Sequence, residues 1–293
     1  MIQRGELALT NKTFLFINTS VGLEVMLGQL IIDNRQQNPS TNKPIITNKL
    51  TNKIAMHPND IVTQSQNLID NAYYFYELNH RETSKSLIKT IDTILQQANK
   101  KLQDLDFLGV CIGPGSFTGL RIGISTIKGF SLVTKLPIVS VNTLALNAYN
   151  VVRPTKQLEI NGKKIDVKNS LESSFVNKSN LSTQSNKIIL SIVDGSNGVY
   201  YIAKYKLDED NLICLLQPTC IYAKDIFSHM LKNDFIVCDT QETANQLDCK
   251  FLPLTPLRIF WAIQSNNSNS VDYKTLEPFY IRKAQPDRTK EDI

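Results

Sequence analysis

Residues 107–135 read FLGVCIGPGSFTGLRIGISTIKGFSLVTK, and this stretch predicts a strand, a glycine turn and a helix in succession. The apolar run at 107–112 is short and rich in residues typical of a buried strand. It ends at Gly113-Pro114-Gly115, where glycine permits a sharp turn, and Ser116 stands where a helix N-cap is expected. Apolar residues then recur at helical spacing. Bare amides and the positive helix end would face out of such a turn, which can therefore hold a phosphate.

Three better-known glycine motifs do not fit this stretch. A Walker A loop needs Lys directly after its last Gly, but Leu120 follows Gly119. Thr118 stands where the dinucleotide fingerprint needs its third Gly, and Ser116 lacks the Gly two residues earlier that a nucleophile elbow requires. From these residues alone, a tight turn that packs a helix closely on a sheet is favoured over a phosphate site.

The run Gly113–Gly123, GPGSFTGLRIG, resembles the TsaB (YeaZ) family, and the larger relative TsaD carries a similar segment. The ending at 277–283, EPFYIRK, also resembles the TsaB ending. This resemblance implies an α/β protein with a two-lobed actin-like fold, each lobe RNase H-like with a mixed sheet flanked by helices. Strands that alternate with helices, twice over, agree with that architecture.

The expected organisation has four parts. Residues 1–12 form a flexible extension, and 13–148 form the first lobe with a polar insertion at about 33–67. Residues 149–187 form a flexible insertion or linker, because they are polar and show little periodicity. Residues 188–293 form the second lobe with a C-terminal tail. Within the first lobe, apolar spacing predicts an amphipathic helix at 83–99.

Composition indicates an ordinary globular protein. The 293 residues carry a net charge of +5 from scattered lysines, which permits nonspecific nucleic-acid affinity without arguing for it. The five cysteines are odd in number and form no CxxC pair, so we expect reduced, buried thiols in a cytoplasmic protein. No apolar run approaches the ~20 residues of a membrane span, so we expect no membrane contact.

The resemblance also suggests where a nucleotide would bind. In the actin-like superfamily the first strand ends in an Asp that orients the Mg–phosphate group, whereas this chain has Asn18. A neutral amide cannot act as a base or supply charge to Mg²⁺. Ser196 and Val199 likewise stand where TsaB proteins carry Arg and Glu. The candidate nucleotide- or phosphate-binding residues are Asn18, Thr19, Gly113, Gly115, Ser116 and Asp194.

A partner surface is the second kind of candidate site. In TsaB the helices of the first domain form the face that docks onto TsaD, and small residues let another helix approach closely. The candidate interface residues are Thr118, Gly119, Arg121, Gly123, Leu87 and Ile91.

The leading hypothesis is a non-catalytic partner subunit. The resemblance implies a heterodimer with a TsaD-type subunit, assisted by a TsaE-type ATPase. Together they would transfer a threonylcarbamoyl group to N6 of the adenosine beside the anticodon in tRNA. The chain would touch tRNA through the complex and carry no intrinsic cofactor, with ATP or ADP at the partner interface. Whether it forms a homodimer when alone is left open.

An ATP-dependent small-molecule kinase or ATPase is the alternative, using residues 113–116 and Asp194. A peptidase activity is not supported, because the sequence shows no recognisable nucleophile with its base and no set of metal ligands. The histidines His57, His80 and His229 include no pair spaced four apart, unlike the metal-binding pair of TsaD. The sequence therefore predicts neither a catalytic residue nor a metal site.

Overall fold

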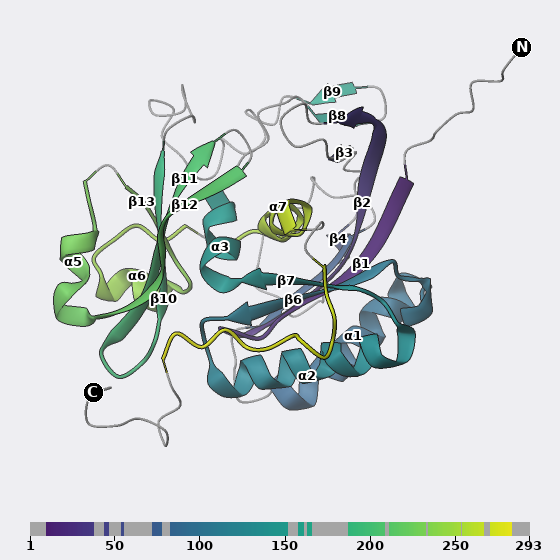
Figure 1. Cartoon of the computed structure of the whole chain (residues 1–293), viewed down its shortest axis with the longest axis horizontal. Helices are drawn as coiled ribbons and strands as arrows, with labels where there is room; N and C mark the ends of the chain where they lie inside the picture. Colours follow the sequence, from purple (N-terminus) through teal and green to yellow (C-terminus); the bar gives the residue numbers. More distant parts are fainter. Residues whose placement is uncertain are drawn as a thin grey trace, which may run out of the picture.

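The computed structural model describes residues 10–37, 44–46, 54–55, 72–77, 83–151, 158–160, 163–165, 187–208, 211–232, 234–252, 254–266 and 270–282. Within these ranges the chain forms two main sheets and a set of helices on their faces (Figure 1). None of the helices in these ranges has the length and apolar character needed to cross a membrane.

The first sheet is mixed and has the strand order β14-β7-β6-β1-β2-β5-β4, with β3 paired to β2. Strands β1, β2 and β5 are antiparallel neighbours, whereas β1, β6 and β7 run parallel. Its strands are β1 (Thr10–Asn18), β2 (Leu23–Gln37), β3 (Pro44–Ile46), β4 (Ile54–Ala55), β5 (Ala72–Glu77), β6 (Phe107–Gly113), β7 (Ile138–Asn142) and β14 (Ser270–Val271).

The second sheet repeats the central pattern of the first. Its order is β12-β11-β10-β13, with two antiparallel pairs followed by the parallel pair of β10 and β13. The segment β5-β2-β1-β6 of the first sheet has the same order and directions. The strands are β10 (Ile188–Asp194), β11 (Val199–Asp208), β12 (Asn211–Tyr222) and β13 (Phe235–Cys238), and β8 (Leu158–Ile160) pairs separately with β9 (Lys163–Ile165).

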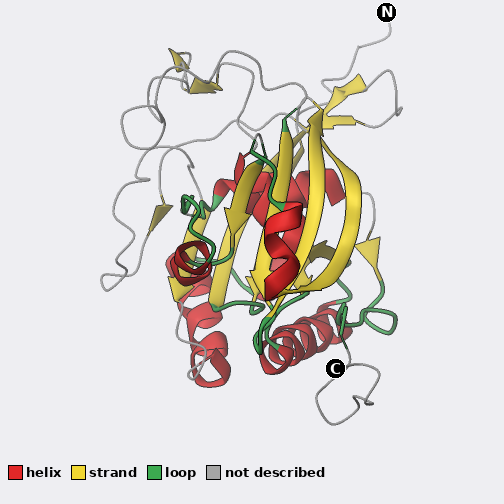
Figure 2. Cartoon of the chain, turned by 90° about the vertical axis from the view of Figure 1, so that its left-hand side faces the viewer, coloured by secondary structure: helices red, strands yellow, loops and turns green. Residues whose placement is uncertain are grey.

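Helices cover both sheets, as the two perpendicular views show (Figures 1 and 2). Helices α1 (Thr83–Gln97) and α2 (Phe117–Thr134) lie on the outer face of the first sheet, and α3 (Thr143–Ala148) and α7 (Leu257–Asn266) lie between the sheets. The remaining helices are α5 (Ile226–His229), α6 (Gln241–Gln246) and the 3-10 turns η2 (Leu102–Asp104), η3 (Tyr149–Val151) and η5 (Ala223–Asp225).

Strand alternation divides the apolar side chains between two faces of the first sheet. On β1, Leu15 and Ile17 face the core under α1 and α2, whereas Phe14 and Phe16 face the space between the sheets. That inner core also contains Ile189 of β10 and residues of α7. One hydrophobic core therefore fills the space between the two sheets, and each lobe has a further core of its own.

The structure corrects several predicted bounds. Strand β1 begins at Thr10, within the segment predicted as an extension, and β2 runs to Gln37, into the predicted insertion. Strands β3 and β4 lie within that insertion, and its other residues are outside the described ranges. Helix α6 and strand β14 were not predicted, because each is too short to show periodicity.

The largest correction concerns the end of the chain. The sequence analysis assigned all of 188–293 to the second lobe, but β14 pairs with β7 of the first sheet. Leu276 is then buried in the core under α1 and α2. In Figure 1 this yellow segment runs across the first sheet and above α2. The position of this segment is set by the burial of a few apolar residues against the first lobe. Such long-range contacts cannot be predicted from the local sequence pattern.

Candidate functional site

The turn after β1 lies directly against α2. A Cβ at Gly119 would overlap the carbonyl oxygen of Thr19, and a Cβ at Gly123 would overlap its Oγ1. The small residues of α2 therefore serve to admit the 18–20 turn of the same chain. Gly119 and Gly123 are buried by this contact and are not available to a partner.

The glycine turn after β6 closes onto the same 18–20 turn. Gly113 has a φ of 110°, which favours glycine, and a Cβ at Gly115 would overlap the oxygen of Ser20. The N–H of Ser116 donates to Ser20 O at 2.6 Å. Ser116 is the N-cap of α2, as predicted, and its Oγ accepts from the N–H of Gly119 at 3.2 Å. Two of the amides that a phosphate would use are thus already bonded within the chain.

The C-terminal segment covers the outer side of this turn. The N–H of Phe279 donates to Ile112 O at 2.7 Å, and the Tyr280 ring stacks on Phe117 with centroids 4.6 Å apart. The guanidinium of Arg121 lies 4.0 Å from the centre of the Phe117 ring, and its Nε donates to Tyr280 Oη at 3.3 Å. The first turn of α2 is therefore flanked by protein on two sides.

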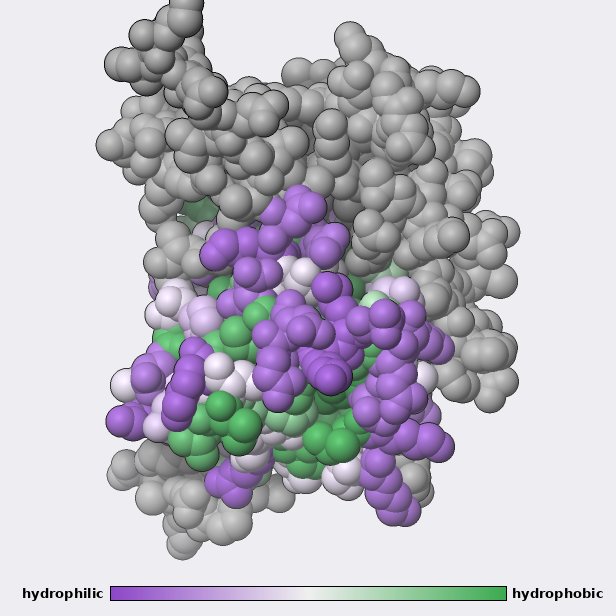
Figure 3. All heavy atoms as spheres, turned by 90° about the vertical axis from the view of Figure 1, so that its right-hand side faces the viewer, coloured by the Kyte–Doolittle hydropathy of each residue, from purple (hydrophilic) through white to green (hydrophobic). Residues whose placement is uncertain are grey.

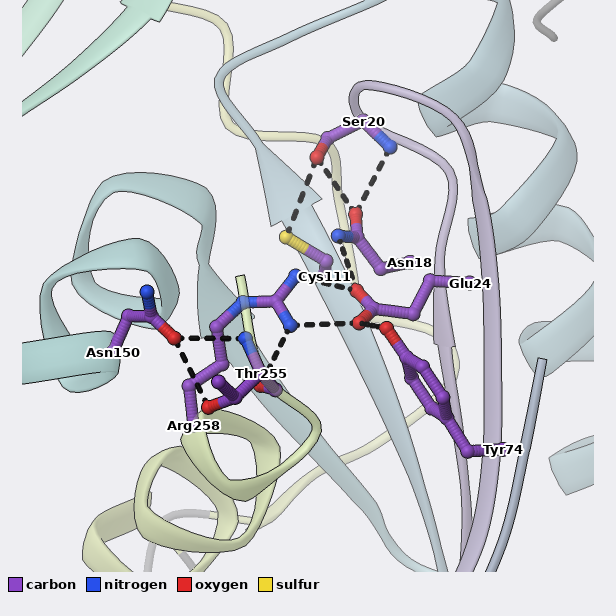
Figure 4. Close-up of polar contacts among 8 residues, drawn as sticks. All are labelled: Asn18, Ser20, Glu24, Tyr74, Cys111, Asn150, Thr255 and Arg258. Atoms are coloured by element: carbon purple, nitrogen blue, oxygen red, sulfur yellow. Dashed lines mark hydrogen bonds and ion pairs between the residues drawn. The ribbon is translucent and has the colours of Figure 1, made fainter. Parts of the chain in front are cut away.

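A buried polar network begins at the end of β1 (Figure 4). Asn18 Nδ2 donates to Glu24 Oε2 at 3.0 Å, and Asn18 Oδ1 accepts from the N–H and the Oγ of Ser20 at 3.0 and 2.6 Å. Glu24 in turn accepts two hydrogen bonds from Arg258, at 2.7 and 2.8 Å, and one from Tyr74 Oη at 2.7 Å. Both the nitrogen and the oxygen of the Asn18 amide are consequently engaged in hydrogen bonds within the chain.

Burial and charge fix the protonation states in this network. Burial raises the pKa of Tyr74 well above its ordinary value, and the charge of Glu24 raises it further. Burial also raises the pKa of neighbouring Tyr76 to about 12, again with a contribution from Glu24. Burial alone would lower the pKa of Arg258, but the charge of Glu24 outweighs this and raises it. The network therefore contains one ion pair and neutral tyrosines.

The network extends to the thiol of Cys111 on one side and to the start of α7 on the other. The thiol of Cys111 on β6 donates to Ser20 Oγ at 3.9 Å and lies 3.1 Å from Thr143 Oγ1. Burial raises the pKa of this thiol, which keeps it protonated. On the other side, Asn150 Oδ1 accepts from the N–H and Oγ1 of Thr255, just before α7. The network thus joins both turns of the first lobe to the helix between the lobes.

The second lobe carries two carboxylates at the ends of parallel strands. Asp194 is exposed, and its Oδ1 accepts from the N–H of Ser196 at 2.8 Å, as in an ordinary turn. Asp239 is only 3% exposed, and its oxygens accept from the N–H groups of Asp194 and Thr240 at 3.1 and 2.9 Å. Burial raises the pKa of Asp239. Sequence analysis did not select Asp239, although it directly follows the apolar run of β13.

The predicted nucleotide residues divide into two groups. Asn18, Thr19, Gly113, Gly115 and Ser116 lie together at the carboxyl ends of β1 and β6. The hydrogen bonds of Asp194 instead connect it to the second lobe, to Asp239 and Ser196. In the described part of the chain, no group of three or more His, Cys, Asp or Glu side chains is placed to hold a metal ion.

The predicted interface residues also divide. Thr118 and Arg121 are exposed, whereas Leu87 and Ile91 are 1% and 3% exposed and belong to the core, as Gly119 and Gly123 belong to the turn contact. The exposed apolar residues of these helices are Ile88 (54%), Leu132 (48%) and Val133 (76%), which sequence analysis did not select. Because Leu87 and Ile88 are adjacent and both apolar, the sequence did not show which of them faces the sheet. Figure 3 shows a largely hydrophilic face on the right of Figure 1, with apolar side chains visible between polar ones.

Comparison with known proteins connects the glycine turn to one family. The family model described as TsaD, tRNA N6-adenosine threonylcarbamoyltransferase, matches residues 77–161. TsaB of Escherichia coli is 37% identical over 78 residues, which are 27% of this chain and 34% of that relative. TsaB of Buchnera aphidicola from Acyrthosiphon pisum is 35% identical over 74 residues, 25% of this chain and 34% of the relative.

The solved structures extend the likeness from this segment to the whole fold. An uncharacterised Pseudomonas aeruginosa protein described as similar to the peptidase YeaZ superposes with a TM-score of 0.55 at 15% identity. The match covers 92% of this chain and 100% of that one. YeaZ from Pseudomonas aeruginosa gives a TM-score of 0.54 at 13% identity, covering 92% and 99%. The predicted two-lobed α/β fold with mixed sheets and flanking helices is confirmed.

Part of the chain is thus similar to TsaB and TsaD proteins, and the fold as a whole is similar to that of YeaZ. The aligned segments span about a third of the length of the curated relatives that they match, between 34% and 38% for the first three. The family match at 77–161 includes α1, the glycine turn, α2 and α3. Asn18, Glu24 and Arg258 lie outside it, so the buried network is a feature of this chain that the family match does not describe.

Proposed function

We propose that this chain is a non-catalytic partner subunit in the synthesis of threonylcarbamoyladenosine in tRNA. In this role it docks onto a TsaD-type enzyme, which carries out the transfer to N6 of the adenosine beside the anticodon. A TsaE-type ATPase assists, and tRNA contacts the chain within the complex. The TsaB relatives are named for biosynthesis of this nucleoside and support the proposal.

One observation in the structure carries the non-catalytic part of the proposal. At the strand end where a kinase-like relative needs a free carboxylate, Asn18 presents an amide that is bonded to Glu24 and Ser20. It has no charge to offer Mg²⁺ and no lone pair free to act as a base. The neighbouring Glu24 cannot replace it, because its carboxylate is paired with Arg258.

The proposed docking surface consists of the exposed sides of α1 and α2. Ile88 is 54% exposed on α1, and Thr118 and Arg121 are exposed near the start of α2. Apolar anchors surrounded by polar residues are typical of protein interfaces. We expect Ile88 to act as such an anchor, with Arg121 held in a defined position by Tyr280.

The test is to mix the purified chain with a TsaD-type subunit, a TsaE-type ATPase and unmodified tRNA. Complex formation is followed by size-exclusion chromatography with light scattering, and the modified nucleoside by mass spectrometry of digested tRNA. Ile88→Arg should weaken binding tenfold or more, because it places a charge at the centre of the contact. Leu231→Arg is the matched control, since Leu231 is 55% exposed on the second lobe.

Two results would count against the proposal. The first is a chain that remains separate from TsaD at micromolar concentration and does not change the yield of modified tRNA. The second is tight Mg–ATP binding with turnover by the chain alone, which would support the kinase or ATPase alternative. The internal hydrogen bonds of Ser116 and Gly119 argue against that alternative, because they occupy amides that a phosphate would need.

A further inference from the structure

Two cysteines of the second lobe lie with their sulfurs in contact. Cys238 ends β13, and Cys249 follows α6, with 3.6 Å between the two sulfurs. None of the five cysteines forms a disulfide in the structure. Cys238 is buried at 1% exposure, whereas Cys249 is half-buried and in partial contact with solvent. Cys249 is thus the more exposed residue of the pair, and Cys238 lies behind it in the core of the second lobe.

The segment between the two cysteines is anchored at both ends. Thr240 caps the start of α6 by accepting from the N–H of Thr243 at 3.1 Å. At the other end the N–H of Cys249 donates to Ala244 O at 3.0 Å. Ala244 is fully buried in the core of the second lobe. The short helix therefore holds the two sulfurs near each other in the reduced protein.

We propose that Cys238 and Cys249 are an oxidative modification site that forms a reversible disulfide with a small-molecule disulfide as oxidant. A disulfide bond is about 2.05 Å long, so the sulfurs must approach by roughly 1.5 Å from 3.6 Å. Side-chain rotation together with a small shift after α6 can supply this movement. Because exchange depends on access to the attacking sulfur, Cys249 would be the attacking cysteine and Cys238 the resolving one.

The chemistry proceeds in two exchanges. The Cys249 thiolate attacks one sulfur of the small disulfide, and the other sulfur leaves as a small thiolate. The Cys238 sulfur then attacks Cys249 in this mixed disulfide, and the second small thiolate leaves and takes the Cys238 proton. Two protein thiols are oxidised, and one small disulfide is reduced to two thiols. The burial of Cys238 suits the second step, which needs no access for an outside molecule.

The bond would act on the carboxylate next to it. Asp239 directly follows Cys238 and accepts the N–H of Asp194. A disulfide would tie the end of α6 to the end of β13 and so restrain the position of Asp239. It would also close a short loop in the unfolded chain, which stabilises the folded state.

The experiment exposes the full-length chain to oxidised glutathione and maps its thiols by peptide mass spectrometry under non-reducing conditions. We expect one cross-linked peptide pair joining Cys238 and Cys249, and a thermal midpoint that rises by roughly 4–8 °C and returns on reduction. Cys214 is the internal comparison: it is exposed, and its thiol donates to Leu216 O. It should retain a mixed disulfide with glutathione.

Two variants separate the roles of the cysteines. Cys238→Ala should trap the mixed disulfide on Cys249, and Cys249→Ala should leave Cys238 unreacted. Circular dichroism checks that each variant is folded. If a variant is unfolded, the peptide mapping of the unmodified chain alone decides the test. Absence of the cross-linked peptide, or glutathione held stably on Cys249 of the unmodified chain, would overturn the proposal. Equal reaction of Cys238 in the Cys249→Ala variant would also overturn it.

Discussion

Arg258 on α7 and Glu24 on β2 form a two-fold hydrogen-bonded ion pair, with nitrogen–oxygen distances of 2.7 and 2.8 Å and 1% exposure of each residue. Burying two charges costs desolvation energy, which is offset only where geometry is good and the remaining lone pairs are bonded. Tyr74 and Asn18 supply those further bonds to Glu24. The pair thus fixes the helix between the lobes to the central sheet of the first lobe.

Removing one partner of this pair should destabilise the protein strongly. Arg258→Met leaves Glu24 buried without its counter-charge, and we expect a loss of about 3–5 kcal/mol in the free energy of unfolding. Denaturant titration measures this loss. The double variant Glu24→Gln with Arg258→Met retains an acceptor for Tyr74 without the charge, and should recover at least half of it. A double variant no more stable than Arg258→Met would contradict the stated role of charge.

Restoring an acidic residue at the end of β1 should also be unfavourable. Asn18→Asp removes the Nδ2 donor to Glu24 and places a second carboxylate about 3 Å from the first. We expect a cost of about 1–3 kcal/mol at pH 7. The introduced carboxyl should have a raised pKa, so the cost should shrink as the pH falls and the group becomes protonated.

Asn18→Ala provides the comparison for this effect. It loses the hydrogen bond to Glu24 and also the two bonds from Ser20, but it adds no charge. Its cost should remain nearly constant between pH 7 and pH 5, whereas that of Asn18→Asp should decline. Urea unfolding at the two pH values measures both. Parallel pH dependence in the two variants would show that the repulsion from Glu24 is negligible.

The close contact of α2 with the 18–20 turn predicts a contrast between two glycines. Gly119→Ala would drive its methyl group into the carbonyl oxygen of Thr19, so the backbone must move, and we expect a loss of about 2 kcal/mol or more. Gly129→Ala lies in the same helix with nothing within 4 Å of the new methyl group. It should stabilise the protein by roughly 0.5–1 kcal/mol, because Ala favours helix over Gly. Thermal unfolding of both variants tests the contact directly.

Stability should fall at alkaline pH. Burial raises the pKa of Tyr76 from its ordinary value of 10.0 to about 12, so the folded state holds the phenolic proton more tightly than the unfolded chain. This contribution is complete below pH 10 and is lost as the pH rises through 12, on the order of 1.4 kcal/mol per pH unit. Tyr76→Phe should reduce the slope of unfolding free energy against pH in this window, and urea unfolding at several pH values between 9 and 12 measures that slope. An unchanged slope in Tyr76→Phe would contradict the prediction.

The parts of the fold that local pattern could predict are those built from long periodic or motif-bearing segments. The strand, turn and helix around Ser116 were predicted with the correct N-cap, and the amphipathic helix predicted at 83–99 is α1. Interior charges were not predicted, although Glu24 and Arg258 each stand within an otherwise apolar stretch. A charged residue in such a stretch is the signal that could have identified them, because buried charges are almost always paired.

Residue type did not determine exposure on α1. Leu87 and Ile88 are adjacent and both apolar, yet one is 1% and the other 54% exposed. Only the packing of α1 on β2 decides which of them faces the sheet. The small residues of α2 raised the same difficulty, since their spacing suits a partner helix as well as the 18–20 turn of this chain.

The return of β14 and Leu276 to the first sheet means that neither half of the polypeptide is self-sufficient. A fragment ending near residue 165 would lack an edge strand and would leave Glu24 without Arg258. Separate expression of the halves should therefore yield insoluble or unfolded material. A single backbone break between residues 165 and 187 should leave two pieces that remain associated and melt together.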